Sequence, residues 1–228
     1  MRKLVLFDID GTLVLTGAAG LRAMNRACAE ILGPGIALEG IPVAGRTDRI
    51  ILTDVLARHG RALDEPLLGA LRERYVTYLR EEIELPGHGT KGIMPGVRPL
   101  LDELHQRDDV FLGLLTGNFE AGARIKLEYF DLWRYFRCGA YGDDAADRNA
   151  LVPFAVDRAQ GCGLPALGPE HILVVGDTPH DVACARAAGA VAVAVATGSF
   201  SVDQLRGTGA DIVFQDLSDT ANVLRLFL

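Results

Sequence analysis

Five short runs of consecutive apolar residues are the feature that most restricts how this chain can fold. Between them lie longer segments whose apolar residues recur at helical spacing, such as the segment after Pro95. Strands that are apolar on both faces are typical of a parallel sheet covered by helices on both sides. The alternation therefore predicts an α/β fold with a doubly wound parallel sheet. The expected strands are residues 4–7, 110–115, 172–175, 191–195 and 212–214.

One long segment, residues 15–92, lacks such runs and shows helical periodicity instead. A helix is expected between Pro66 and Pro86, with an apolar face formed by Leu67, Leu68, Leu71, Tyr75 and Leu79. We therefore predict an all-helical cap, residues 15–92, inserted after the first strand. The remaining residues, 1–14 and 93–228, are expected to form the α/β core.

Composition excludes several classes of protein. The 228 residues carry 23 basic and 30 acidic side chains, a net charge of −7, which is unfavourable for binding nucleic acid. The four cysteines are far apart and suit a reduced protein better than a disulfide scaffold. The longest apolar stretch, residues 187–196, is about half as long as a membrane-spanning helix requires. We expect a cytoplasmic protein that binds neither nucleic acid nor a membrane.

Acidic residues follow two of the expected strands. Asp8 and Asp10 come after the strand at 4–7, and Asp177 and Asp181 come after the strand at 172–175. The carboxyl ends of parallel strands form the ligand-binding edge of such a sheet. Two carboxylates 4 Å apart would repel by roughly 4 kcal/mol at an effective dielectric near 20, so a divalent cation is expected there, and Mg²⁺ is usual beside phosphate.

Simpler interpretations of these acids are a solvated loop end, a fragment of a calcium loop, or a helix cap. The calcium-loop pattern is incomplete, because its third acidic position and its terminal Glu are missing. Capping by Asp177 or Thr178 would explain one acid but not two strand ends with the same chemistry.

A third strand end, after residues 110–115, carries Thr116-Gly117-Asn118 before a helical pattern. A hydroxyl and backbone N–H groups at a helix N-terminus form an anion site, although the same tripeptide is also a common turn and cap. A cation should face the acids, and Arg148 is best placed for this, with an exposed structural arginine as the alternative. The other cations considered are Arg124, Lys126, Arg134, Arg137 and Arg158.

These four segments, in this order, resemble the motifs of the haloacid dehalogenase superfamily, specifically its phosphatases similar to phosphoglycolate phosphatase and β-phosphoglucomutase. The resemblance covers essentially the whole chain. It implies that Asp8 is the nucleophile and Asp10 the general acid/base. It also implies that Thr116, Gly117 and Asn118 bind the phosphate.

The same resemblance implies a metal site and a substrate-facing cap. The metal ligands would be Asp8, Asp177 and the backbone carbonyl of Asp10, with Asp181 beside Asp177. Arg148 would fill the cationic phosphate-binding position, where the family usually has Lys followed by Pro. In the cap, Gly45-Arg46-Thr47-Asp48 resembles a short substrate-facing motif, so Arg46 and Thr47 are expected to contact the substrate.

The function implied by the resemblance is a Mg²⁺-dependent phosphatase that acts on a small phosphorylated metabolite through an aspartyl-phosphate, with phosphoglycolate favoured. A phosphomutase keeps the same motifs and stays open as an alternative. A catalytically silent phosphate-binding or partner-binding module would be expected to lack Asp8 or Asp10, and both are present. Residues 87–92 match G-x-G-x-x-G but follow Pro86 rather than a strand, so no dinucleotide site is expected. No pattern in the sequence indicates an oligomeric state.

Overall fold

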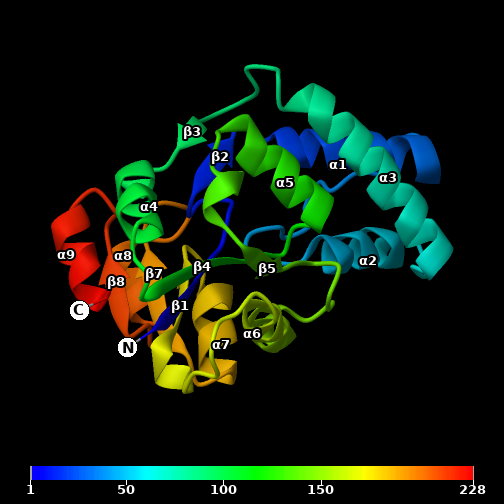
Figure 1. The fold of residues 1–228 in the computed structure, drawn as a ribbon. Coiled ribbons are helices and arrows are strands. Elements are labelled where there is room, and N and C mark those ends of the chain that lie inside the picture. Colours follow the sequence, from blue (N-terminus) through cyan, green and yellow to red (C-terminus); the bar gives the residue numbers. More distant parts are fainter. Residues whose placement is uncertain (1, 228) are drawn as a thin grey trace.

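A six-stranded sheet forms the centre of the protein (Figure 1). The computed structural model describes residues 2–227, and the strand order is β5-β4-β1-β6-β7-β8 with every neighbouring pair parallel. All five predicted strands are present, and the predicted α/β class is confirmed. The strands of this sheet are β1 (Lys3–Phe7), β4 (Val110–Leu115), β5 (Cys138–Ala140), β6 (Ile172–Gly176), β7 (Val191–Val195) and β8 (Ile212–Phe214).

Helices cover both faces of the sheet, because successive strand residues point to opposite sides. Val5 and Phe7 belong to one apolar cluster, whereas Leu4 and Leu6 belong to another. Each of these side chains is at most 1% exposed, and burial of such a side chain contributes about 1.5–3 kcal/mol. One face packs against α4 (Val97–His105), α5 (Glu120–Tyr129) and α9 (Thr220–Leu224), and the other against α6 (Leu151–Gly161), α7 (Pro179–Ala187) and α8 (Val202–Arg206).

The cap is a separate group of three helices, which lie together at the right of Figure 1. They are α1 (Ala19–Leu32), α2 (Asp48–Arg58) and α3 (Glu65–Glu82), and they share their own apolar cluster. The helix predicted between Pro66 and Pro86 is α3. Its start is defined by the Asp64 side chain, which accepts a hydrogen bond from the Leu67 N–H, and by Pro66 in the first turn.

Two short strands connect the cap to the core. β2 (Val14–Thr16) pairs antiparallel with β3 (Lys91–Ile93), whereas the lack of apolar runs predicts no strand between residues 15 and 92. Strands of this length show no periodicity of their own, so only their pairing reveals them. The predicted limits of the cap therefore fall inside this pair of strands. Met1 and Leu228, the ends of the predicted core, lie outside the described residues.

Short 3₁₀ segments complete the described chain at Trp133–Tyr135, Arg148–Ala150, Pro169–His171 and Arg225–Phe227. Cys28, Cys138, Cys162 and Cys184 are all free thiols. None of the helices within residues 2–227 is long and apolar enough to cross a membrane.

Candidate active site

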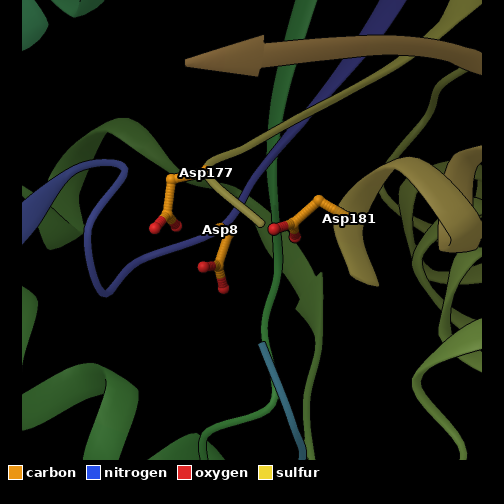
Figure 2. A group of neighbouring side chains, drawn as sticks. All are labelled: Asp8, Asp177 and Asp181. Atoms are coloured by element: carbon orange, nitrogen blue, oxygen red, sulfur yellow. The ribbon is translucent and has the colours of Figure 1, made fainter. Parts of the chain in front are cut away.

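Three buried aspartates meet at the carboxyl edge of the sheet. Because β1 and β6 are neighbours, Asp8 and Asp177 leave the sheet side by side, and Asp181 joins them from the first turn of α7. One carboxylate oxygen from each lies within 4.8 Å of the others, and Figure 2 shows the three side chains converging from separate segments. The three residues are only 2–4% exposed. The structure thus brings together three of the four predicted acids.

The cluster is electrostatically unfavourable as it stands. Burial, followed by repulsion from Asp8 and Asp181, raises the pKa of Asp177 from 3.8 to about 8. Burial also raises the pKa of Asp8 to about 6, although Arg148 opposes this and Asp181 and Asp10 add to it. A positive charge placed among these oxygens would remove both penalties.

The backbone around the cluster leaves room beside the carboxylates. A Cβ on Gly11 would lie 2.5 Å from Asp177 Oδ2, and a Cβ on Gly198 would lie 1.7 Å from the same atom, so neither position accepts a side chain without a shift. Thr12 donates a hydrogen bond to Asp177 Oδ1 at 3.1 Å, which orients the carboxylate. The three carboxylates supply hard oxygen donors in a confined space that lacks enough positive charge to balance them. Such a site fits a small divalent cation such as Mg²⁺.

Arg148 is the cation that faces this cluster. Its Nη2 lies 2.9 Å from Asp8 Oδ1 and 2.5 Å from Asp181 Oδ1, and the residue is only 6% exposed. An exposed structural arginine is therefore excluded. Burial acts to lower the pKa of Arg148, but Asp181 and Asp8 outweigh that effect and raise it, so the guanidinium stays charged. The predicted contact of Arg148 with phosphate stays a prediction.

Thr116 and Asn118 form a second polar group next to the acids. The Asn118 side-chain amide donates to Thr116 Oγ1 at 2.8 Å and to Asp10 Oδ2 at 2.8 Å. Gly117 lies under the cap, because a Cβ there would be 2.1 Å from the carbonyl oxygen of Arg46. All three residues of the predicted phosphate segment therefore line the same edge as Asp8 and Asp10.

Lys126 is a further site residue, which the sequence alone places only among the other candidate cations. Its Nζ donates to Asp10 Oδ2 at 2.6 Å and to Asn118 Oδ1 at 2.6 Å, and its side chain is 5% exposed. The Asp10 carboxylate is consequently held by Lys126 and Asn118 and is not part of the three-aspartate cluster. The sequence signal that could have identified Lys126 is its helical spacing, because Ala123, Lys126 and Leu127 share the buried face of α5.

Thr47 and Asp48 attach the cap to the core. The Thr47 hydroxyl donates to the carbonyl oxygen of Ala146 at 2.7 Å and accepts from the Ile50 N–H, and the residue is 1% exposed. Asp48 accepts from the Phe119 N–H at 2.9 Å, and burial raises the pKa of this carboxyl to about 7. The Thr47 side chain is thus engaged within the protein, and its predicted substrate contact stays untested.

Arg46 lines the site but its guanidinium already has partners. Nη2 lies 2.6 Å from Asp54 Oδ2, and Nη1 donates to the carbonyl oxygen of Pro42 at 3.0 Å. A substrate contact by Arg46 would therefore compete with Asp54. The role predicted for Arg46 remains a prediction.

The carboxylates of Asp8, Asp10 and Asp177 line a cavity of about 520 Å³ between the core and the cap. Its core side carries Asp8, Asp10, Asn118, Lys126 and Arg148, and its cap side is largely apolar. The cap residues on that side include Leu21, Met24, Leu38, Val43, Ile51 and Tyr75. A larger open depression of about 950 Å³, lined by residues of α3 and α5, contains none of the three clustered aspartates.

The sequence profile of the haloacid dehalogenase-like hydrolases matches residues 2–189. The chain belongs to this family. A phosphoglycolate phosphatase of Rhodospirillum rubrum is 32% identical over 226 residues, which cover 98% of this chain and 91% of the relative. A phosphoglycolate phosphatase of Agrobacterium fabrum is 28% identical and covers 96% of this chain and 90% of its own. The crystal structure of CbbY from Rhodobacter sphaeroides in complex with phosphate shares the fold, with a TM-score of 0.70, 21% identity and 96% coverage of both chains.

Family membership confirms the resemblance stated from the sequence motifs. It also agrees with the geometry, because Asp8, Thr116, Arg148 and Asp177 all meet at one edge of the sheet. The site is that of a hydrolase.

Proposed function

We propose that this hydrolase is a Mg²⁺-dependent phosphatase that cleaves a small phosphate monoester through an aspartyl-phosphate, with phosphoglycolate as the first candidate substrate. The observation that carries the proposal is the buried cluster of Asp8, Asp177 and Asp181. One carboxylate oxygen of each lies within 4.8 Å of the others, and Asp8 and Asp177 line a cavity. The names of the relatives from Rhodospirillum rubrum and Agrobacterium fabrum support the choice of substrate.

Asp8 supplies the nucleophile in this proposal. With a pKa of about 6, its carboxyl is mainly ionised at neutral pH, and Arg148 at 2.9 Å fixes one oxygen while the other attacks phosphorus. The attack forms an O–P bond on Asp8 and breaks the ester bond, which divides one difficult displacement into two steps. Asp8, Asp177 and Asp181 would hold Mg²⁺, which supplies charge neutralisation and orientation of the phosphoryl group when bound.

Asp10 is placed to move the protons. The first step requires its protonated form, which donates that proton to the departing ester oxygen. In the second step the resulting carboxylate takes a proton from the water that attacks the aspartyl-phosphate, which restores the acid. The Asn118 amide and the Lys126 ammonium hold its carboxylate in place. The Thr116 hydroxyl stands beside it as a donor for the phosphoryl oxygens. Asn118 would join it only by giving up one of the two hydrogen bonds that its amide donates to Asp10 and Thr116.

The cap completes the site by excluding water. Its apolar wall faces the carboxylates across the cavity, and the contacts of Asp48 with Gly117 and Phe119 join it to the phosphate-binding segment. A cap in this position shields the reacting groups and selects the leaving group.

The decisive test is release of inorganic phosphate from phosphoglycolate and from an aryl phosphate, measured with Mg²⁺ and with a chelator. We expect release only with the metal, and none from the Asp8→Asn variant. Undiminished turnover after complete metal removal would contradict the proposed mechanism. Interconversion of sugar phosphate isomers without phosphate release would establish a phosphomutase instead.

A further inference from the structure

The Lys126 ammonium has a donor that the protein itself does not use. Its two hydrogen bonds within residues 2–227 go to Asp10 and Asn118, which leaves one of its three N–H groups. The residue lines the active-site cavity although its side chain is only 5% exposed. A buried cation with a free donor at the floor of a cavity is suited to bind an anionic group of a ligand.

Two further residues lie next to the Lys126 ammonium: Tyr75, whose hydroxyl is a second donor, and Gly20, which has no side chain. A Cβ on Gly20 of α1 would lie 3.3 Å from Lys126 Nζ and 3.7 Å from the Tyr75 hydroxyl. The two polar groups therefore flank one spot, the ammonium from the core and the hydroxyl from the cap. Gly20 has no positive φ that would require glycine, so the lack of a side chain there serves space rather than backbone conformation.

Tyr75 is also able to donate at this spot. Burial, with the nearby Asp48 and Asp10, raises the pKa of Tyr75 well above its usual value, so the hydroxyl stays protonated. Tyr75 lines the same cavity as Lys126 and Gly20.

The position of Lys126 defines where a bound anion would sit on the substrate. Its Nζ lies 2.6 Å from the carboxylate of Asp10, the group that protonates the ester oxygen in the proposed function. A group held by Lys126 must therefore be close to the ester oxygen. In the phosphate ester of a 2-hydroxy acid, the carboxylate is attached to the carbon that bears this oxygen.

The other cations of the cavity are less suited to this task. Arg148 binds Asp8 and Asp181 through Nη2, and although its buried Nε has no partner among the described residues, the whole guanidinium lies on the side of the phosphoryl group. Arg46 is paired with Asp54 in the cap. We propose that Lys126 determines substrate specificity by binding the carboxylate of a phosphorylated 2-hydroxy acid, with the Tyr75 hydroxyl as the second donor. This inference rests on the proposed phosphatase function.

The test compares two substrates that differ only at the group in question. Phosphoglycolate carries the carboxylate, and 2-hydroxyethyl phosphate carries a neutral CH₂OH in its place. For Lys126→Met, we expect kcat/KM to fall about 10- to 100-fold more for phosphoglycolate than for the neutral ester, the effect of losing one charged hydrogen bond. Lys91→Met is the matched control, because the Lys91 ammonium binds backbone carbonyls near the end of α3, and it should leave the ratio unchanged.

A second variant tests the same spot without removing the charge. Gly20→Ala places a methyl group between Lys126 and Tyr75. The α-helix itself should tolerate the change, because alanine has a higher helix propensity than glycine. It should reduce the preference for phosphoglycolate in the same direction, and it keeps the inference testable if Lys126→Met does not fold.

The outcomes separate the inference from the proposed function. Equal losses on both substrates in both variants would show that Lys126 only positions Asp10, which would overturn the inference and leave the phosphatase function intact. If the wild-type protein releases phosphate from neither ester and from no aryl phosphate in the presence of Mg²⁺, the proposed function itself fails.

Discussion

Replacement of Asp177 by Asn should make the metal-free protein more stable at alkaline pH. In the native state the pKa of Asp177 is about 8, whereas its usual value is 3.8, because the carboxyl is buried beside Asp8 and Asp181. Between these two pH values the native state binds a proton that the unfolded chain has lost. The free energy of unfolding of the wild type must therefore fall as the pH rises through this range. An Asn side chain has the same shape and no proton to lose.

The size of the effect follows from the proton count. One proton bound only by the native state changes the free energy of unfolding by about 1.4 kcal/mol per pH unit, hence by about 2–3 kcal/mol between pH 6 and pH 8. For a chain of this length, 1 kcal/mol shifts Tm by about 2–4 °C, so the wild type should lose roughly 5–10 °C over this range relative to Asp177→Asn. Thr12 can still donate to the Asn oxygen, so the local hydrogen bond is kept.

The assay is thermal unfolding of both proteins from pH 6 to pH 8 in the presence of a chelator. Addition of Mg²⁺ at about 100 times its Kd should then stabilise the wild type at pH 8 by about 2.7 kcal/mol and the variant much less. Parallel pH profiles for the two proteins would refute the reasoning, because they would show that Asp177 is not the group whose deprotonation destabilises the native state.

Three further substitutions test the site. Mass spectrometry of trapped wild-type protein should find phosphate on Asp8, and Asp8→Asn should abolish turnover; a label on a Ser, Thr or His would contradict the assignment. Arg148→Met leaves Asp8 and Asp181 buried without their cation and should lower the free energy of unfolding by about 3–5 kcal/mol in chelator, with partial recovery in Mg²⁺; an unchanged urea midpoint would argue against this. Arg46→Ala removes a partly exposed ion pair with Asp54 and should change stability by less than about 1 kcal/mol. Its loss of kcat/KM for phosphoglycolate should be smaller than that of Lys126→Met, and a larger loss would assign the specificity role to Arg46.

The sheet and its acidic edge follow from local sequence patterns. A run such as residues 4–7 is apolar throughout because both faces of a parallel strand are buried, and this pattern is visible without any partner strand. Asp8 and Asp177 stand at the ends of such runs, so the rule that strand ends share one edge was sufficient to predict their meeting. Arg148 was predicted for the same reason, from its position between a short strand and a helix.

Other features depend on contacts between residues far apart in the chain. Lys126 and Asp10 are separated by 116 positions, and Thr47 and Ala146 by 99, so no local pattern links them. Pairing of β2 with β3 likewise joins segments that are separated in the sequence by the whole cap. Periodicity and motif spacing indicate which face of a helix or strand is buried and which end bears the functional side chains. Which side chain from another element completes the site is decided by packing. For Lys126, the packing of α5 against β2 and against α3 of the cap brings the ammonium to Asp10.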